Sequence, residues 1–290
     1  MSTQQMNSVV LVDLTGTIDP AFLSQVSSAL DQQVTRDLAT TWSGISAHVK
    51  AVSSLSSLRR GDWPVYLVAT LPPGEGGYHQ DKNKRPYAKV IASADDPSWT
   101  VDASHEVCEM LVDPYGSRLQ ASNGIMIQGG QVVDGDGTFE YLVEACDPCE
   151  ANNFAYEIAG VAVSDFITPN YYDSDARPGV RYSFQGNITR PRQMLEGGYI
   201  SFVNAADELQ QILWVDTPQP VLKTLGPANG MSLREHVHLQ MGEAAYKAKH
   251  LQRRKAGGLR KDIQRRVNAT SIELEAARAR AGLLKTLHRL

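Results

Sequence analysis

Four short apolar runs, rich in β-branched and aromatic residues, divide the first third of the chain. Runs of this length between polar segments are typical of strands in a sheet. We expect strands at residues 9–13, 45–52, 63–69 and 87–93, the last of them at a sheet edge. Residues 72–77 are mostly proline and glycine and predict a loop, which we expect to continue through Tyr78 and His79.

Two helical patterns interrupt these runs. Pro20 follows Asp19, the order expected at a helix N-terminus. Apolar residues then recur at every fourth position and predict one apolar stripe, formed by Phe22, Val26, Leu30, Val34 and Leu38. The second pattern covers residues 99–113, which are apolar around most of the helix circumference, so we expect this helix to be buried between other elements.

Beyond Pro114 the chain becomes rich in turn-forming residues. Residues 134–137 and 159–160 each lie between short apolar runs and predict the turns of two hairpins. Residues 167–198 predict long loops that pack against the body or cover it, and residues 199–203 predict its final strand. The fold class expected from these patterns is α+β, with a mixed sheet, a buried helix, a β-hairpin and loop region, and a C-terminal α-helical extension.

We interpret residues 1–204 as the body, 205–231 as a linker and 232–290 as a basic helical extension. Ser232 to Glu235 has the pattern of a capping box, and apolar residues recur at heptad spacing between Leu259 and Leu284. This spacing is typical of a helix that docks or oligomerises. We therefore expect a protein partner, or an assembly of several copies, at residues 232–290.

Charge is distributed unevenly over the 290 residues. Residues 241–290 hold 13 lysines and arginines against 4 aspartates and glutamates, whereas residues 1–240 hold 15 against 28. The basic segment is expected to meet an acidic surface, which could be the body, a partner protein or, less favoured, nucleic acid. No apolar run approaches the roughly 20 residues that span a bilayer, and the N-terminus lacks the pattern of a signal peptide. We expect neither membrane insertion nor export.

The buried helix carries the residues with the clearest chemical signal. His105 and Glu109 are one turn apart, and Glu106 follows His105, so the segment is an HExxH arrangement with Glu in place of the second His. In such an arrangement His105 and Glu109 would bind a metal, with zinc the expected ion, and Glu106 would activate the bound water as a general base.

A metal at this helix needs a third protein ligand. Asp113 has the right helical spacing, although it also precedes Pro114 and could cap the local turn instead. The segment 144–150 offers Glu144, Asp147 and Glu150 from a separate part of the chain. We favour Asp147 or Glu150, because an acid from another element completes a site in three dimensions. Tyr78 or His79 could reach the site as an oxyanion stabiliser.

Other interpretations of these residues remain open. The acidic groups could form a hydrogen-bonded structural network without a metal. Cys146 and Cys149 form a CxxC pair that could be a disulfide, part of a mixed cysteine and histidine site, or two buried thiols, which we favour. Residues 134–137 resemble the start of a calcium loop but lack its later ligands, so a hairpin turn is preferred.

Four segments together resemble a known group of proteins. The strand and helix order, ending in the HExxE helix, resembles the zincin-like metallopeptidase fold of the metzincin and archaemetzincin type. The segments 104–114, 144–150, 163–169 and 197–200 resemble a group of uncharacterised bacterial and phage proteins with an SHExxEMxxDP motif. The likeness covers about residues 8–203. The chain departs from metzincins in lacking the second His, and Val112 and Tyr115 stand where the later Gly and His of their extended motif would be.

The resemblance implies a zincin-like domain with His105 and Glu109 as metal ligands and Glu106 as base. The expected function is a metal-dependent hydrolase of peptides or proteins, or a catalytically impaired descendant, with an extended substrate pairing along strand 87–93. The alternative is a structural or assembly protein of a phage particle that keeps the fold as a scaffold. The expected location is accordingly cytoplasmic or virion-associated.

Overall fold

The computed structural model describes residues 6–71, 76–215, 217–227, 233, 234 and 236. The first half of the chain forms a five-stranded sheet in the order β2-β1-β3-β5-β4. Its strands are β1 (Asn7–Asp13), β2 (Ala47–Val52), β3 (Asp62–Val68), β4 (Gly77–Asp81) and β5 (Pro86–Ile91). Four of them run parallel, and β4 pairs antiparallel with β5 at the edge of the sheet. The α+β class expected from the sequence is confirmed.

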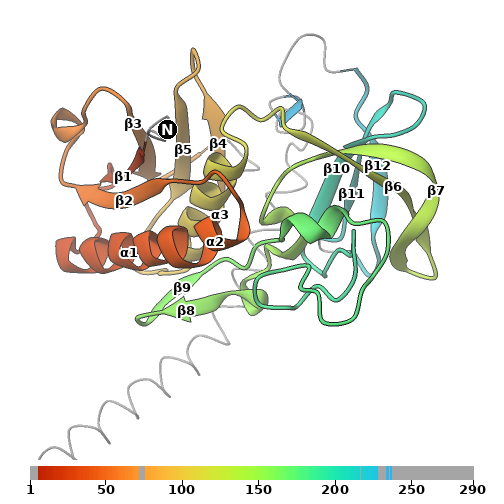
Figure 1. Ribbon diagram of the computed structural model, residues 1–290. Coiled ribbons are helices and arrows are strands. Elements are labelled where there is room, and N and C mark those ends of the chain that lie inside the picture. The colour runs from red at the N-terminus through yellow and green to blue at the C-terminus, as the bar shows by residue number, and fades with distance from the viewer. Residues whose placement is uncertain (1–5, 72–75, 216, 228–232, 235, 237–290) are drawn as a thin grey trace, which may run out of the picture.

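Two long helices pack beside this sheet (Figure 1). Helix α1 (Pro20–Gln32) begins at Asp19, whose side chain accepts hydrogen bonds from the backbone of Ala21 and Phe22. The helix continues through a π-helical segment (Gln33–Leu38) into the short α2 (Ala39–Thr41). Helix α3 (Trp99–Val112) lies against β4 and β5, and its Trp99 meets Phe22 of α1 edge-on at 6.0 Å. Both predicted helices are confirmed.

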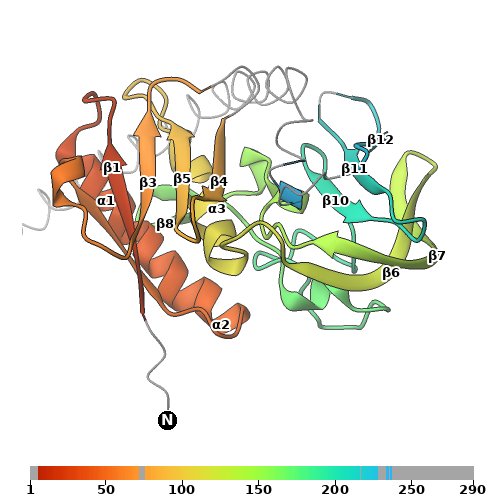
Figure 2. The ribbon, with the colours of Figure 1, turned by 90° about the horizontal axis from the view of Figure 1, so that it is seen from above.

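A second sheet, formed by strands from the second half of the described chain, lies on the far side of α3 from α1 (Figure 2). Its order is β12-β11-β10-β7-β6. The strands are β6 (Leu119–Gln128), β7 (Gln131–Leu142), β10 (Tyr199–Val203), β11 (Leu209–Leu213) and β12 (Val221–Thr224). A separate hairpin of β8 (Tyr156–Ile158) and β9 (Val161–Val163) packs on α3. Short 3-10 turns stand at Leu55–Ser57, Asp147–Cys149, Asn152–Phe154 and Pro169–Tyr172.

The prediction for the sheet edge was wrong. Residues 87–91 belong to β5 (Pro86–Ile91), which has β3 on one side and β4 on the other, and is therefore interior. The edge is β4, which contains Tyr78 and His79, the residues expected in a loop. The error has a physical cause: β4 is Gly-Tyr-His-Gln-Asp and carries no β-branched residue, so its strand conformation comes from pairing with β5 and not from local propensity.

The first predicted hairpin turn was also wrong. Residues 134–137 form no turn and lie within β7. The pairing of β7 with β6 continues before and after a shift of register at Gly124 of β6. The turn is at residues 129–130, and both glycines there have positive φ. Asp134 accepts hydrogen bonds from the buried Arg192 at 2.9 and 3.1 Å, so its carboxylate serves a structural ion pair. The second predicted hairpin is confirmed as β8 and β9.

The segment expected to be a linker contains two strands. Residues 209–213 and 221–224 form β11 and β12, which extend the second sheet past residue 204. Residues 199–203 are thus a strand, as predicted, but not the last one. The expected C-terminal helical extension lies outside the described residues, except for Leu233, Arg234 and His236. No helix in the described part of the chain is long and apolar enough to cross a membrane.

Candidate metal centre

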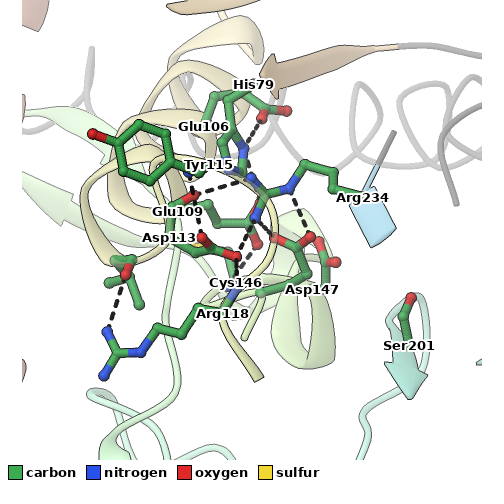
Figure 3. A network of polar contacts seen from close by, with 12 residues as sticks. His79, Glu106, Glu109, Asp113, Tyr115, Arg118, Cys146, Asp147, Ser201 and Arg234 are labelled. Atoms are coloured by element: carbon green, nitrogen blue, oxygen red, sulfur yellow. Dashed lines mark hydrogen bonds and ion pairs between the residues drawn. The ribbon is translucent and has the colours of Figure 1, made fainter. Parts of the chain in front are cut away.

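Helix α3 lies between the two sheets (Figure 2), and its Glu106 and Glu109 meet polar side chains from other segments (Figure 3). His105, Glu106 and Glu109 are at most 5% exposed. Burying charged groups costs several kcal/mol or more unless they are paired or bind a cation. The i, i+4 spacing predicted from the sequence brings Nε2 of His105 to 3.1 Å from Oε2 of Glu109.

The acidic segment 144–150 meets this helix, as predicted. Nε2 of His105 lies 3.2 Å from Oδ1 of Asp147, which belongs to the 3-10 turn Asp147–Cys149. That oxygen has no aligned hydrogen-bond partner among the described residues, even though Asp147 is 1% exposed. The 3.2 Å between His105 Nε2 and Asp147 Oδ1 does not make a hydrogen bond by itself, because the N–H must also point at the oxygen. An unsatisfied buried carboxylate oxygen beside a histidine is what a cation site without its cation would contain.

The backbone fixes the positions of these groups. Oε1 of Glu109 accepts a 3.0 Å hydrogen bond from the backbone N–H of Cys146, immediately before Asp147. Gly198 of the neighbouring segment lies so close that a Cβ there would be 2.6 Å from the carbonyl oxygen of Asp147. The turn that carries Asp147 is therefore held from both sides, by α3 and by the residue preceding β10.

The pKa values reflect the mutual influence of these charges. Burial alone disfavours the imidazolium, but the carboxylates of Glu109 and Asp147 outweigh it and raise the pKa of His105 well above its usual value. Burial likewise opposes the Glu109 carboxylate, yet the charge on His105 lowers the pKa of Glu109. Burial, aided by the Glu109 charge, raises the pKa of Asp147 well above normal.

Of the two candidates Tyr78 and His79, the structure brings His79 to the site, from a strand and not from the loop that the sequence predicted. His79 enters from edge strand β4, and its Nδ1 lies 3.2 Å from Oε2 of Glu106 and 3.6 Å from Oε2 of Glu109. Burial and the nearby Arg234 lower the pKa of His79, which favours its neutral form. Tyr78 is next to it in the strand and so points to the opposite face. There the Tyr78 ring contacts Tyr87 and Lys89, away from the cluster.

Asp113 and Glu144 are engaged by a residue that sequence reasoning missed. Arg234, 7% exposed, donates from Nε and Nη2 to the two oxygens of Glu144 at 2.7 and 2.6 Å. Its Nη2 also lies 3.5 Å from Asp113. Asp113 accepts from the backbone N–H of Arg118 at 2.8 Å, so it caps the turn after α3, the alternative that the sequence left open.

The described residues contain three groupings whose ligand atoms lie within 4.8 Å of one another. They are His105 with Glu109 and Cys146, His105 with Asp147 and Glu150, and His79 with Glu109 and Glu144. Asp113 is in none of them. Cys108, Cys146 and Cys149 are free and buried, so Cys146 and Cys149 form no disulfide. The first grouping keeps the mixed cysteine and histidine site among the alternatives. Histidine nitrogen with carboxylate oxygen is a donor set that suits zinc and similar divalent ions.

Comparison with protein-family models, with curated proteins and with solved structures finds no match for this chain.

Gly198→Ala is expected to weaken metal binding by about 10- to 100-fold, the range seen when groups that orient metal ligands are changed. A methyl group at this position would meet the backbone oxygens of Asp147 and Pro148 at 2.6 and 2.8 Å, so the turn carrying Asp147 must shift. Competition titration with a zinc indicator measures the change. Unchanged zinc affinity in a folded variant would contradict the assigned position of Asp147.

Zinc is expected to stabilise the protein more as the pH rises from about 5.5 to 8. In the metal-free protein the pKa values of His105 and Asp147 are raised, so protonation of these groups stabilises the fold. This stabilisation is complete below the unfolded-state pKa values and is lost as the pH rises through the folded-state values. The lowered pKa of Glu109 acts oppositely, and its contribution is lost only in acid. Zinc displaces the protons, so its apparent affinity should rise by up to about tenfold per pH unit per proton. Thermal unfolding with and without a chelator tests this; a zinc-dependent shift that is constant with pH would contradict it.

Proposed function

We propose that the protein is a metal-dependent hydrolase of peptides, with a zincin-like first sheet and a zinc ion held by His105, Glu109 and Asp147. One observation carries the proposal: three potential ligands converge in the interior, and Oδ1 of Asp147 has no hydrogen-bond partner in the described part of the chain. Glu150, at the rim of the same cluster, is a further carboxylate within reach. When bound, zinc would polarise a carbonyl and lower the pKa of a water.

The arrangement of elements supports this proposal. A mixed sheet packed on a buried helix that carries the HExxE motif agrees with a zincin-like layout, although the antiparallel edge strand is β4 and not residues 87–93. The carboxylate of Glu106 is buried and lies against His79. In the proposed reaction Glu106 takes a proton from water and passes it to the leaving amine, and neutral His79 orients the carboxylate.

The substrate is proposed to be an extended peptide. Strand β4 is at the sheet edge, so its outer backbone groups have no strand partner in the described structure. A peptide could pair there as an added strand and would pass beside His79 and the buried helix. This replaces the pairing expected along residues 87–93, of which 87–91 lie inside the sheet.

The proposal is tested by measuring metal in the purified protein and hydrolysis of an unfolded protein substrate. We expect close to one equivalent of zinc, loss of hydrolysis after chelation, and recovery when zinc is returned. Mass spectrometry of the products would identify the cleaved bonds. Failure to bind any divalent ion would overturn the proposal, whereas bound zinc without hydrolysis of any peptide would leave a metal-stabilised scaffold.

A structural scaffold is the second candidate, and Arg234 favours it. The guanidinium satisfies Glu144 and approaches Asp113, so two carboxylates of the acidic cluster are paired by an arginine of the same chain. This residue also belongs to the segment that we expected to dock to neighbouring subunits. A protein that binds no metal, and whose stability falls sharply in Arg234→Met, would support the scaffold and not the hydrolase.

A further inference from the structure

A guanidinium group is held beside the metal cluster by contacts to all three of its nitrogens. Nε and Nη2 of Arg234 donate to the two oxygens of Glu144 at 2.7 and 2.6 Å. Nη1 donates to the backbone oxygen of Asp113 at 3.0 Å. This two-point contact with the carboxylate matches the planar fork of a guanidinium, and the single ammonium group of a lysine cannot reproduce it.

The backbone after α3 is shaped to an arginine residue. The backbone N–H of Arg234 donates to the carbonyl oxygen of Gly116 at 3.2 Å. A Cβ at Gly116 would lie 2.7 Å from Cβ and 3.1 Å from Nη1 of Arg234, so a side chain at position 116 would displace the arginine. The carboxylate of Asp113 fixes this turn by accepting from the backbone N–H of Arg118. The turn therefore forms a recess that fits both the stem and the head of an arginine.

Arg234 lies beside the groups that are proposed to carry out the reaction (Figure 3). Its partner Glu144 has a carboxylate oxygen within 4.8 Å of ligand atoms of His79 and Glu109. The arginine charge contributes to the lowered pKa of His79 and to that of Glu109. A peptide that pairs with β4 and passes beside His79 would therefore meet this guanidinium.

Stability alone gives no reason for an arginine at this position. A buried ion pair is often no more stabilising than apolar side chains of the same volume. Arg234 lies outside both sheets, and it reaches Glu144 across 90 positions of the chain. A carboxylate that accepts two bonds, with a recess for the stem beside it, is what a binding site for a peptide arginine requires.

We propose that Glu144, Gly116 and the backbone oxygen of Asp113 form a subsite for the arginine side chain of a peptide, and that Arg234 occupies it as an internal competitor. The role of this subsite in choosing a substrate rests on the proposed function, whereas binding of a guanidinium does not require the metal. A peptide arginine takes the place of Arg234, so the chain's own residue limits access to the cluster.

The test measures binding of N-acetyl-arginine amide to the full-length protein as purified. In Arg234→Ala the subsite is open, so the amide should raise the midpoint of thermal unfolding in a concentration-dependent way. The wild type should bind it at least about tenfold more weakly, because Arg234 already uses the carboxylate. The lysine and citrulline amides should also bind to Arg234→Ala at least about tenfold more weakly, since lysine lacks the fork and citrulline lacks the charge.

Two further variants show where the amide binds. Adding Glu144→Gln to Arg234→Ala should weaken arginine binding at least about tenfold, because glutamine offers one acceptor and no charge. Arg36→Ala is the matched control. Arg36 also bonds one carboxylate through two nitrogens, at 2.6 and 2.8 Å from Asp37, but its side chain is 59% exposed. Its removal should create no binding of arginine amide.

Equal stabilisation of Arg234→Ala by all three amides, or by none, would overturn the subsite. Should this variant fail to fold, the same comparison is made with Arg234→Lys, which keeps a positive charge at Glu144 but not the fork; no preference for arginine amide there would equally overturn it. Arginine-selective binding without hydrolysis by any variant would overturn the hydrolase and leave the subsite. Hydrolysis by Arg234→Ala at equal rates for peptides with and without arginine would overturn the subsite and leave the hydrolase.

Discussion

Replacing His105 with alanine is expected to remove zinc from the purified protein and to lower its zinc affinity by about 1,000-fold or more. His105 is the only nitrogen donor of the proposed zinc site, and both its carboxylate neighbours, Glu109 and Asp147, lie within 3.2 Å of Nε2. The metal content of dialysed protein and a competition titration measure the effect.

The control is His48→Ala. Nδ1 of His48 lies 2.9 Å from Asp31, so it also pairs with a carboxylate, but its side chain is 58% exposed and distant in the fold from α3. It should change neither the zinc content nor the affinity. His105→Ala also leaves Glu109 without its main partner in the metal-free state, a loss worth about 3–5 kcal/mol for a buried pair. The titration is therefore made at a temperature where the variant is still folded. Zinc binding equal to the wild type would refute the assignment of His105.

The second large effect is expected for Glu106→Gln. Glutamine keeps the size of the side chain but cannot take a proton, so the rate of peptide hydrolysis should fall by about 100- to 10,000-fold. Zinc content should stay near one equivalent, because Glu106 faces His79 and is not one of the proposed ligands. The rate of cleavage of an unfolded protein substrate and the metal content are measured on the same preparation.

Glu157→Gln serves as the control, because Glu157 is an exposed residue of β8 and should keep the full rate. Comparable hydrolysis by Glu106→Gln and the wild type would remove Glu106 from the chemistry while leaving the metal site standing. Loss of zinc together with hydrolysis would instead make Glu106 a ligand. These outcomes separate the role of Glu106 from that of His105.

Local sequence patterns predicted a large part of the first half of the fold. The apolar stripe ending at Leu38, the N-cap at Asp19 and the apolar helix 99–113 all depend on residues within one or two turns of each other. Helical geometry alone places His105 and Glu109 on one face. The strand conformation of residues 134–137 shows the limit, because glycine and aspartate mark turns in one context and bulged strands in another.

The sequence by itself determined the buried helix, its HExxE residues and the acidic segment around Asp147 that would meet it. Only the tertiary structure decided which other groups reach the cluster. His79 belongs to a strand that is held by its neighbour, and Arg234 reaches Glu144 across 90 positions of the chain. Strand pairing and long-range ion pairs depend on how separate segments pack, and residue spacing carries no record of it. In the same packing Asp113 caps the turn after α3, and His79, Glu109 and Glu144 lie close to one another.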